Sequence, residues 1–314
     1  MGWYSYGKSV ANTGRRLPAL THSEEFIMTG NSNRSQLTKM AAFVAFLILI
    51  TVTGAIYYFF FKPEVDSVAQ NAPLNSKIVT IEEKIELVSE INAPSGIAYD
   101  DEHERFLVIT DDYRFFVLNA DLNEVLFEST FQDGVEKEGI TYLGDDQAVI
   151  LAENGTVVFM EDKGDNNWVE GTRTSFTPSG PLGSAAYDPL NQHIYTANKK
   201  GEKLIYKLDR QGNLIESFPL HLSEQITANR AYHLTTDYTV AGMTYRDGHL
   251  YLFSEAYSTI FKLDVASKEV KEVFGVQNML ESAGITAKDH NTFYLIGDAE
   301  YYLPRPPIYQ VKLE

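Results

Sequence analysis

Short runs of alternating hydrophobic and polar residues follow one another along the chain after residue 76, separated by turns rich in Gly, Asp and Asn. The runs are rich in β-branched and aromatic residues, which is typical of strands rather than helices. Five segments begin with a similar element built around a glycine, at Gly96, Gly139, Gly183, Gly242 and Gly284. These glycines lie 43, 44, 59 and 42 residues apart, which indicates an internal repeat of about 43 residues.

Each repeat contains several of these runs. After the glycine come a polar turn and a second hydrophobic run, and a fourth run is visible in most copies. The third run lies at residues 115–121, 156–162, 204–209, 260–264 and 308–314. Four strands in a period of about 43 residues are typical of propeller blades. We therefore predict an all-β fold, a five-bladed β-propeller over residues 77–314, because no further glycine-started unit remains for a sixth blade.

The two ends of the predicted propeller complement each other. The last repeat stops after its third strand, and one strand-like run, residues 85–91, lies upstream of the first repeat. Pairing that run with the last blade would close the ring and remove exposed strand edges. We expect this closure.

The N-terminal part carries a different pattern. Residues 40–61 are 22 residues without a charge, long enough for a helix of about 30 Å. We predict a single transmembrane helix there, rather than a buried core helix or a cleaved signal peptide, whose apolar region is usually shorter. Residues 1–39 are then a cytoplasmic tail, and residues 62–76 form a linker to the propeller.

Charge gives the predicted helix a direction. The chain has a net charge of −17 and no cysteine, which excludes disulfides and thiolate metal sites. Residues 1–39 carry five Lys or Arg and two Glu, whereas the part after the span has a net charge of −20. Basic residues on the short side predict a cytoplasmic N-terminus and a propeller outside the bacterial inner membrane. The acidic propeller also argues against nucleic acid as a partner.

A polar residue recurs where the second strand of each repeat ends. It lies 13–15 residues after the glycine of its repeat, at Asp111, Glu153, Asn198, Glu255 and Asp298. Because equivalent ends of propeller blades converge, we expect these side chains to form a ring of oxygen ligands near one mouth of the channel. Crowded carboxylates favour a cation, and Ca²⁺ prefers oxygen ligands. The alternative is that these residues cap strand ends and bind neighbouring turns.

Several units resemble one known family. SGIAYD…FLVITDD, KEGITYLGDDQAVILAENG and AGMTY…LYLFSEA are similar to the SdiA-regulated, YjiK-like proteins, distant relatives of NHL-repeat propellers. The resemblance covers residues 77–314. It implies a five-bladed propeller with an N-terminal membrane segment and a shared Ca²⁺ site, without an established reaction.

The resemblance also adds a candidate ligand. The family places Glu before the motif glycine in several blades, and here only Glu138 keeps it. The other four positions hold Ser95, Leu182, Ala241 and Ala283. We therefore expect a Ca²⁺ site formed by Glu138 with part of the ring, namely Glu153, Glu255 and Asp298, and place Asp111 and Asn198 at the channel rim.

Further rim residues follow from spacing. The longest interval between repeat glycines has its surplus near residues 222–239, where Arg230 and His233 lie. Long loops are often functional, so we predict that these two overhang the channel mouth, with a tolerated surface insertion as the alternative. Tyr113 and Tyr257 follow the polar ring and predict an aromatic rim, although packing between blades also needs aromatic residues.

The sequence assigns no catalytic residues. A nucleophile elbow, HExxH, P-loop and dinucleotide fingerprint are all absent from it. We favour a membrane-anchored module that binds a small molecule or an envelope protein. The alternative is a Ca²⁺-dependent hydrolase of a phosphoester, ester or lactone, in which the ion polarises the scissile group.

Overall fold

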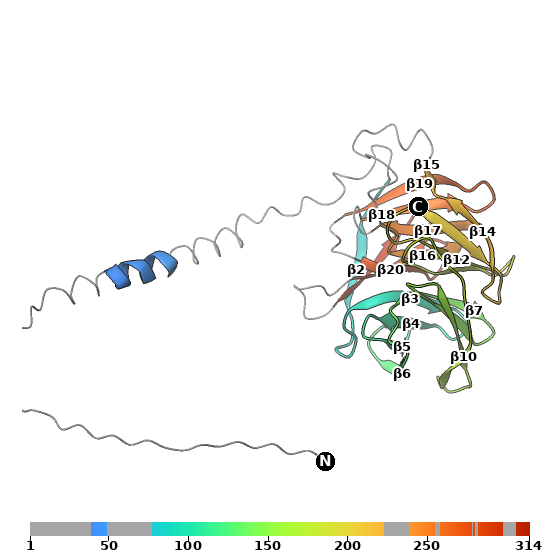
Figure 1. Cartoon of the computed structure of the whole chain (residues 1–314), viewed down its shortest axis with the longest axis horizontal. Coiled ribbons are helices and arrows are strands. Elements are labelled where there is room, and N and C mark those ends of the chain that lie inside the picture. The colour runs from blue at the N-terminus through green and yellow to red at the C-terminus, as the bar shows by residue number, and fades with distance from the viewer. Residues whose placement is uncertain are drawn as a thin grey trace, which may run out of the picture. The chain divides into compact units, whose positions relative to one another are not determined.

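The computed structural model describes residues 39–48, 77–222, 239–254, 258–277, 279, 282–297 and 306–314. The chain divides into two compact units, Met1–Lys62 and Pro63–Glu314. In the first unit, residues 39–48 form a helix, drawn in blue in Figure 1. Within the described residues, no helix reaches the length and apolar character that a membrane span requires. Residues 49–61 of the predicted span lie outside the described residues.

The second unit is a ring of five antiparallel sheets, as predicted. The first strands, such as β3, β16 and β20, lie near its centre, and β6, β14 and β19 lie at its periphery (Figure 1). Blade 1 consists of β3 (Pro94–Asp100), β4 (Arg105–Thr110), β5 (Arg114–Leu118) and β6 (Val125–Thr130). Blade 2 consists of β7 (Lys137–Gly144), β8 (Gln147–Ala152), β9 (Thr156–Asp162) and β10 (Trp168–Ser175).

The other blades follow the same order. Blade 3 consists of β11 (Ala186–Asp188), β12 (His193–Ala197), β13 (Leu204–Leu208) and β14 (Leu214–Pro219). Blade 4 consists of β16 (Gly242–Arg246), β17 (His249–Ser254), β18 (Thr259–Asp264) and β19 (Glu269–Val276), with β1 (Lys77–Val79) and β15 (His221–Leu222) parallel to β19. Blade 5 consists of β20 (Ser282–Ala287), β21 (Thr292–Gly297), β22 (Pro307–Lys312) and β2 (Ile81–Glu86).

The N-terminal strand closes the ring. Strand β2 pairs antiparallel with β22 and completes the last blade, so the expected closure is confirmed. The predicted bounds, residues 85–91, were wrong because the apolar residues after Glu86 do not belong to a strand. Leu87 and Ile91 are buried in the connection, where they pack between blades 5 and 1. The strand itself is mostly exposed.

Hydrophobic packing lies between blades. Five buried clusters occupy the five interfaces between neighbouring blades.

The repeat glycines lie at the axis, where there is little room for a side chain. A Cβ on Gly139 would lie 2.2 Å from the backbone carbonyl carbon of Ser184, and one on Gly242 would lie 2.7 Å from the backbone nitrogen of Ile285. Glycine therefore allows the first strands of adjacent blades to approach closely.

This crowding narrows the channel. The space enclosed by the glycine-containing segments of the first strands is only about 10 Å³. A cavity needs about 10–15 Å³ to hold one water molecule. The axis therefore has a neck between the two mouths of the channel, with room for about one water molecule.

Candidate functional site

Three glutamates meet at the mouth where the first strands begin. Glu138 is the second residue of β7, Glu136 precedes that strand, and Glu153 follows β8. The backbone N–H of Glu153 donates to the carbonyl oxygen of Glu136 at 3.1 Å, which fixes the two segments together. Carboxylate oxygens of all three residues lie within 4.8 Å of one another. We call these glutamates, together with Lys199, the acidic mouth.

The two glutamates that flank Lys137 reach this mouth, whereas Lys137 itself is directed away from it. The carboxylates of Glu136 and Glu138 lie close to that of Glu153, and the Lys137 ammonium contacts Asp133 instead. Lys137 is fully buried and its ammonium lies 2.8 Å from Asp133 Oδ1. Despite partial desolvation, Lys137, the Val135 amide and Arg173 lower the pKa of Asp133 to about 2.

Glu138 has an unusual electrostatic environment. Its side chain is 7% exposed, and burial raises its pKa to about 7. The Lys199 ammonium, 3.0 Å from Glu138 Oε2, opposes this shift, while the charges of Asp111 and Glu153 add to it. A proton is therefore bound and released by Glu138 near neutral pH.

The structure brings part of the predicted ring together. Glu153 joins Glu138, and Asp111 lies close enough to influence its pKa. The backbone N–H of Asp111 donates to Ala93 O, the blade 1 counterpart of the contact between Glu153 and Glu136. The predicted residues Arg230, His233, Glu255, Tyr257 and Asp298 lie outside the described residues.

Two other predicted rim residues have packing contacts. Asn198 is fully buried, and its Nδ2 donates to Ser179 Oγ at 3.1 Å. Its Oδ1 has no hydrogen-bond partner within the described part of the chain. Tyr113 packs against the hydrophobic cluster between blades 1 and 2. Asn198 thus tethers the loop that contains Ser179.

The sequence prediction missed two members of the acidic mouth. The Glu-Lys-Glu pattern at 136–138 contained a signal for Glu136, since it places a second carboxylate two residues before Glu138. Lys199 lies with Lys200 and Lys203 in a basic turn after Asn198, and such a turn does not by itself indicate a site. The contact of Lys199 with Glu138 joins blade 3 to blade 2. The pattern within a single repeat does not indicate which residues of neighbouring blades meet.

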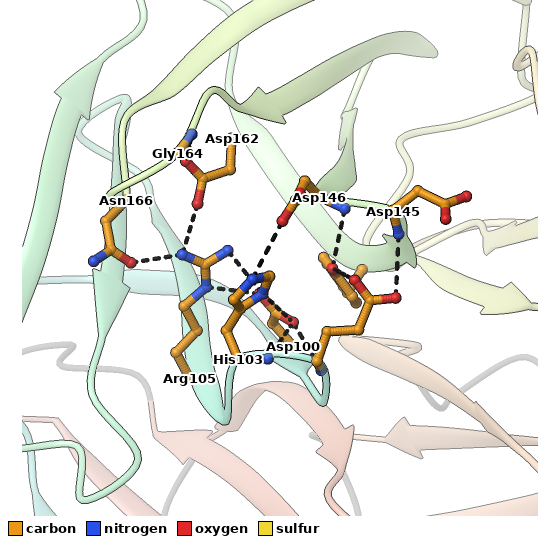
Figure 2. Close-up of polar contacts among 10 residues, drawn as sticks. Asp100, His103, Arg105, Asp145, Asp146, Asp162, Gly164 and Asn166 are labelled. Carbon is orange, nitrogen blue, oxygen red and sulfur yellow. Dashed lines mark hydrogen bonds and ion pairs between the residues drawn. The ribbon is translucent and has the colours of Figure 1, made fainter.

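A second polar cluster joins blades 1 and 2 at the opposite ends of the first strands (Figure 2). Arg105 is 4% exposed, and its Nε donates to Asp100 Oδ2 at 2.6 Å. Its Nη1 donates to Asp162 Oδ2 at 2.7 Å and to Asn166 Oδ1 at 2.6 Å. His103 lies beside this network, with Nε2 3.4 Å from Asp146 Oδ1. The cluster connects two blades and has well-compensated charges.

The same end of the channel contains a large cavity of about 590 Å³. Its floor is apolar and takes one residue from each blade, in the first strand or, for Ala185, directly before it: Ile97, Ile140, Ala185, Met243 and Ile285. Four of the blades add a tyrosine near the end of that strand: Tyr99, Tyr142, Tyr187 and Tyr245. We call this space the tyrosine cavity. The sequence contained this pattern, because three of these tyrosines lie three residues after their repeat glycine and the fourth lies four after.

These features define a five-bladed propeller with a carboxylate cluster at one mouth of its channel and a cavity at the other. The SdiA-regulated family model matches residues 71–302, and the chain belongs to the SdiA-regulated family. The family resemblance of the repeat units is thereby confirmed.

Two solved structures are similar to this chain. The glutaminyl cyclase of Myxococcus xanthus is similar with a TM-score of 0.58 and 13% identity, over 76% of this chain and 98% of that one. The PQQ-bound aldose sugar dehydrogenase of Streptomyces coelicolor is similar with a TM-score of 0.47 and 10% identity, over 77% and 100% of the two chains. At 13% identity, the similarity to the glutaminyl cyclase is evidence for the fold alone. No curated protein matches the chain.

Proposed function

We propose that this SdiA-regulated propeller is a membrane-anchored binding module that binds Ca²⁺ at its acidic mouth. The observation that carries the proposal is the separation of the carboxylate oxygens of Glu136, Glu138 and Glu153, all within 4.8 Å of one another. Oxygens that each lie 2.3–2.6 Å from one calcium ion are at most about 5 Å apart. The three glutamates are therefore close enough to share one ion.

The charges of the acidic mouth also favour a divalent cation. Lys199 compensates one carboxylate of the three through its contact with Glu138. Glu136, Glu138 and Glu153 are the described residues that would hold the ion, and a bound Ca²⁺ would balance their remaining charge. Glu255 and Asp298 share the repeat position of Glu153, so the proposal includes them as further ligands. Lys199 would release Glu138 when the ion binds.

Thermal unfolding of the full chain tests the metal site. A ligand that binds only the folded state stabilises it by about 2.7 kcal/mol at a concentration of 100 Kd. We expect Ca²⁺ to raise the Tm by several degrees, and Mg²⁺ at the same concentration to raise it less because it demands a smaller, octahedral site. The shift should disappear in Glu138→Gln and Glu153→Gln. Glu269→Gln, an equal charge change on the outer strand β19, is the control and should keep it.

Two results would reject this site. One is a Tm that Ca²⁺ leaves unchanged in the wild-type chain. The other is a shift that Glu138→Gln and Glu153→Gln retain in full, since the ion would then bind elsewhere.

Membrane anchoring is the second part of the proposal. It is supported by the 22 uncharged residues at 40–61 and by the five Lys or Arg residues that precede them. In a bacterial cell, the full chain should stay in the membrane fraction after alkaline extraction. External protease should then digest the propeller and spare an N-terminal tag. Release of the intact chain by alkali would contradict the anchor.

A Ca²⁺-dependent hydrolase is the alternative, and one observation favours it. The pKa of Glu138 is about 7, which suits a group that transfers protons at neutral pH. Esters, lactones and phosphomonoesters should be tested with the full chain in Ca²⁺ and in EDTA. Turnover that needs both Ca²⁺ and Glu138 would support this alternative, and turnover insensitive to both would reject it.

A further inference from the structure

The tyrosine cavity lies beyond the site proposed for Ca²⁺, and the neck at the axis lies between the two. The cavity volume of about 590 Å³ is within the range of small-molecule sites, about 300–1,000 Å³. The hairpins that join first and second strands border this end, and in all five blades they lie within the described residues. The shape of the cavity is therefore defined by described residues from every blade.

Hydrogen bonds hold the side chains of Tyr142 and Tyr245 in place. Tyr142 Oη donates to Glu102 Oε2 at 2.6 Å and accepts from the backbone N–H of Asp146 at 3.2 Å. Tyr245 Oη accepts from the backbone N–H of Gly248 at 3.2 Å. Burial, with the charge of Asp188, raises the pKa of Tyr245 to about 12, so its phenol stays protonated at neutral pH. Fixed rings above an aliphatic floor form a preorganised apolar surface.

One side of the cavity differs from the rest. Blade 5 has Ala287 where the other blades have tyrosine, and this leaves more space. The residue after that position is a cation in blades 4 and 5, Arg246 and Lys288, and both line the cavity. Their strands, β16 and β20, are neighbours around the axis. Two positive side chains therefore lie at equivalent positions of adjacent blades, one of which lacks the tyrosine.

These two cations retain binding capacity. The Nε atom of Arg246 is buried and has no hydrogen-bond partner among the described residues, and the nearest carboxylate oxygen, from Asp247, is 3.9 Å away. Lys288 lies over the ring of Tyr99 at 5.6 Å, and no described carboxylate forms an ion pair with it. Its ammonium is thus held at the cavity wall by an aromatic contact.

Two of the three carboxylates that line the cavity, Glu102 and Asp247, have partners, and the third, Asp101, is exposed to solvent. Glu102 accepts the hydroxyl of Tyr142 and the backbone N–H of Asp145. Asp247 Oδ2 lies 2.5 Å from His290 Nδ1. A cationic ligand would compete with these contacts, whereas an anionic ligand would meet donors that are still available. The rim also includes Leu190, which is 85% exposed and extends the apolar surface outward.

We propose that the tyrosine cavity binds a small carboxylic acid with an apolar acyl or aryl body. The carboxylate lies between Arg246 and Lys288, which provide charge-assisted hydrogen bonds. The apolar body lies on the aliphatic floor, surrounded by the tyrosine rings, and reaches toward Leu190. This site requires no bound cation at the acidic mouth.

Calorimetric titration of the purified full chain tests the proposal. Octanoate and phenylbutyrate are the probes, and octanamide and phenylbutyramide are their neutral counterparts. The buffer contains EDTA, so the result does not depend on the proposed Ca²⁺ site. We expect at least one acid to bind saturably, and its amide to bind about tenfold more weakly because the charge-assisted contacts are lost.

Variants locate the carboxylate. Arg246→Gln and Lys288→Gln should each weaken acid binding about tenfold and change amide binding little. Lys288→Arg keeps the charge and should retain most of the affinity. Lys84→Gln is the matched control, because Lys84 also lies over a tyrosine, Tyr309, but on the outer strand β2. It should leave the binding of both probes unchanged.

Three outcomes would overturn the proposal. The first is no saturable binding of either acid up to about 10 mM. The second is equal affinity for an acid and its amide, which would show that the site recognises only the apolar body. The third is acid binding by Arg246→Gln and Lys288→Gln that equals binding by Lys84→Gln.

Discussion

The acidic mouth and the tyrosine cavity lie at opposite ends of the same first strands, yet the carboxylates at the two ends are in different environments. At the acidic mouth, Glu138 is buried beside Glu153, and its pKa rises to about 7. At the cavity rim, Glu102 is exposed and accepts hydrogen bonds, and its pKa is lowered. Each blade can thus have one function at the start of its inner strand and another at the end. Burial and hydrogen bonding of the carboxylates decide the difference.

The largest expected effect concerns the buried network at the cavity end. Arg105→Ala would leave the carboxylates of Asp100 and Asp162 buried without their cation. Breaking a buried ion pair by removing one partner costs about 3–5 kcal/mol. We expect the free energy of unfolding of the full chain to fall by that amount in urea denaturation.

Lys163→Ala is the matched control for this change. Lys163 directly follows Asp162 in blade 2 and pairs with Glu161, but its side chain is 53% exposed. An exposed pair contributes at most about 1 kcal/mol. If Arg105→Ala were no more destabilising than Lys163→Ala, the cavity end would not depend on a buried network.

The propeller could be predicted from the sequence because each blade repeats the same local pattern of strands and turns. Gly139 and its counterparts recur at a nearly constant spacing, and the turns and strands follow in fixed order. Even ring closure was predictable, since the last repeat lacked a strand that the chain supplies as β2. The bounds of that strand were not predictable, because Leu87 and Ile91 have the same apolar character in a buried connection as in a strand.

The site could be predicted only in part. Glu138 and Glu153 were identified as members of one cluster, and the structure brings them together. The contact between Lys199 and Glu138 was not predictable, since it depends on how closely blades 2 and 3 approach. The tyrosine cavity depends similarly on the arrangement of all five first strands. The repeat shows that a tyrosine recurs at the position of Tyr142, but it does not show that these tyrosines enclose a cavity.

The second prediction concerns the pH dependence of stability at the acidic mouth. The pKa of Glu138 rises from 4.5 to about 7 on folding, so the folded state binds its proton more tightly. The resulting stability is fully present below pH 4.5 and is lost as the pH rises toward 7. Glu138→Gln has no carboxyl group to ionise, so its stability does not fall with pH in this way. Measured in EDTA between pH 5 and 8, the variant should gain about 1–3 kcal/mol relative to the wild-type chain.

Ca²⁺ gives this prediction a second readout. A bound cation favours the ionised carboxylate, so it should stabilise the wild-type chain most at high pH. The advantage of Glu138→Gln should therefore shrink or reverse when Ca²⁺ replaces EDTA. If the two chains kept the same difference at every pH, the raised pKa of Glu138 would be refuted.

The smallest effect is expected at the cavity rim, and its sign is opposite. Hydrogen bonds from Tyr142 and from the backbone N–H of Asp145 lower the pKa of Glu102 below 4.5. The stability that Glu102 provides is present above pH 4.5 and is lost as the pH falls through its folded pKa. Glu102→Gln should therefore cost stability at pH 7 and progressively less at lower pH. Because the side chain is exposed, the cost should stay below about 1 kcal/mol.

Tyr142→Phe separates the hydrogen bond from the charge of Glu102. It removes the hydroxyl that donates to Glu102 Oε2 and leaves the ring in the cavity wall. If that bond lowers the pKa, the double variant should cost less than the sum of the two single variants in urea denaturation. Additive costs would instead assign the shift to the backbone N–H groups of Asp145 and Asp146. In both cases, the free energy of unfolding relative to the wild-type chain should rise with pH for Glu138→Gln and fall with pH for Glu102→Gln. Slopes of the same sign would contradict the described difference between the two ends of the channel.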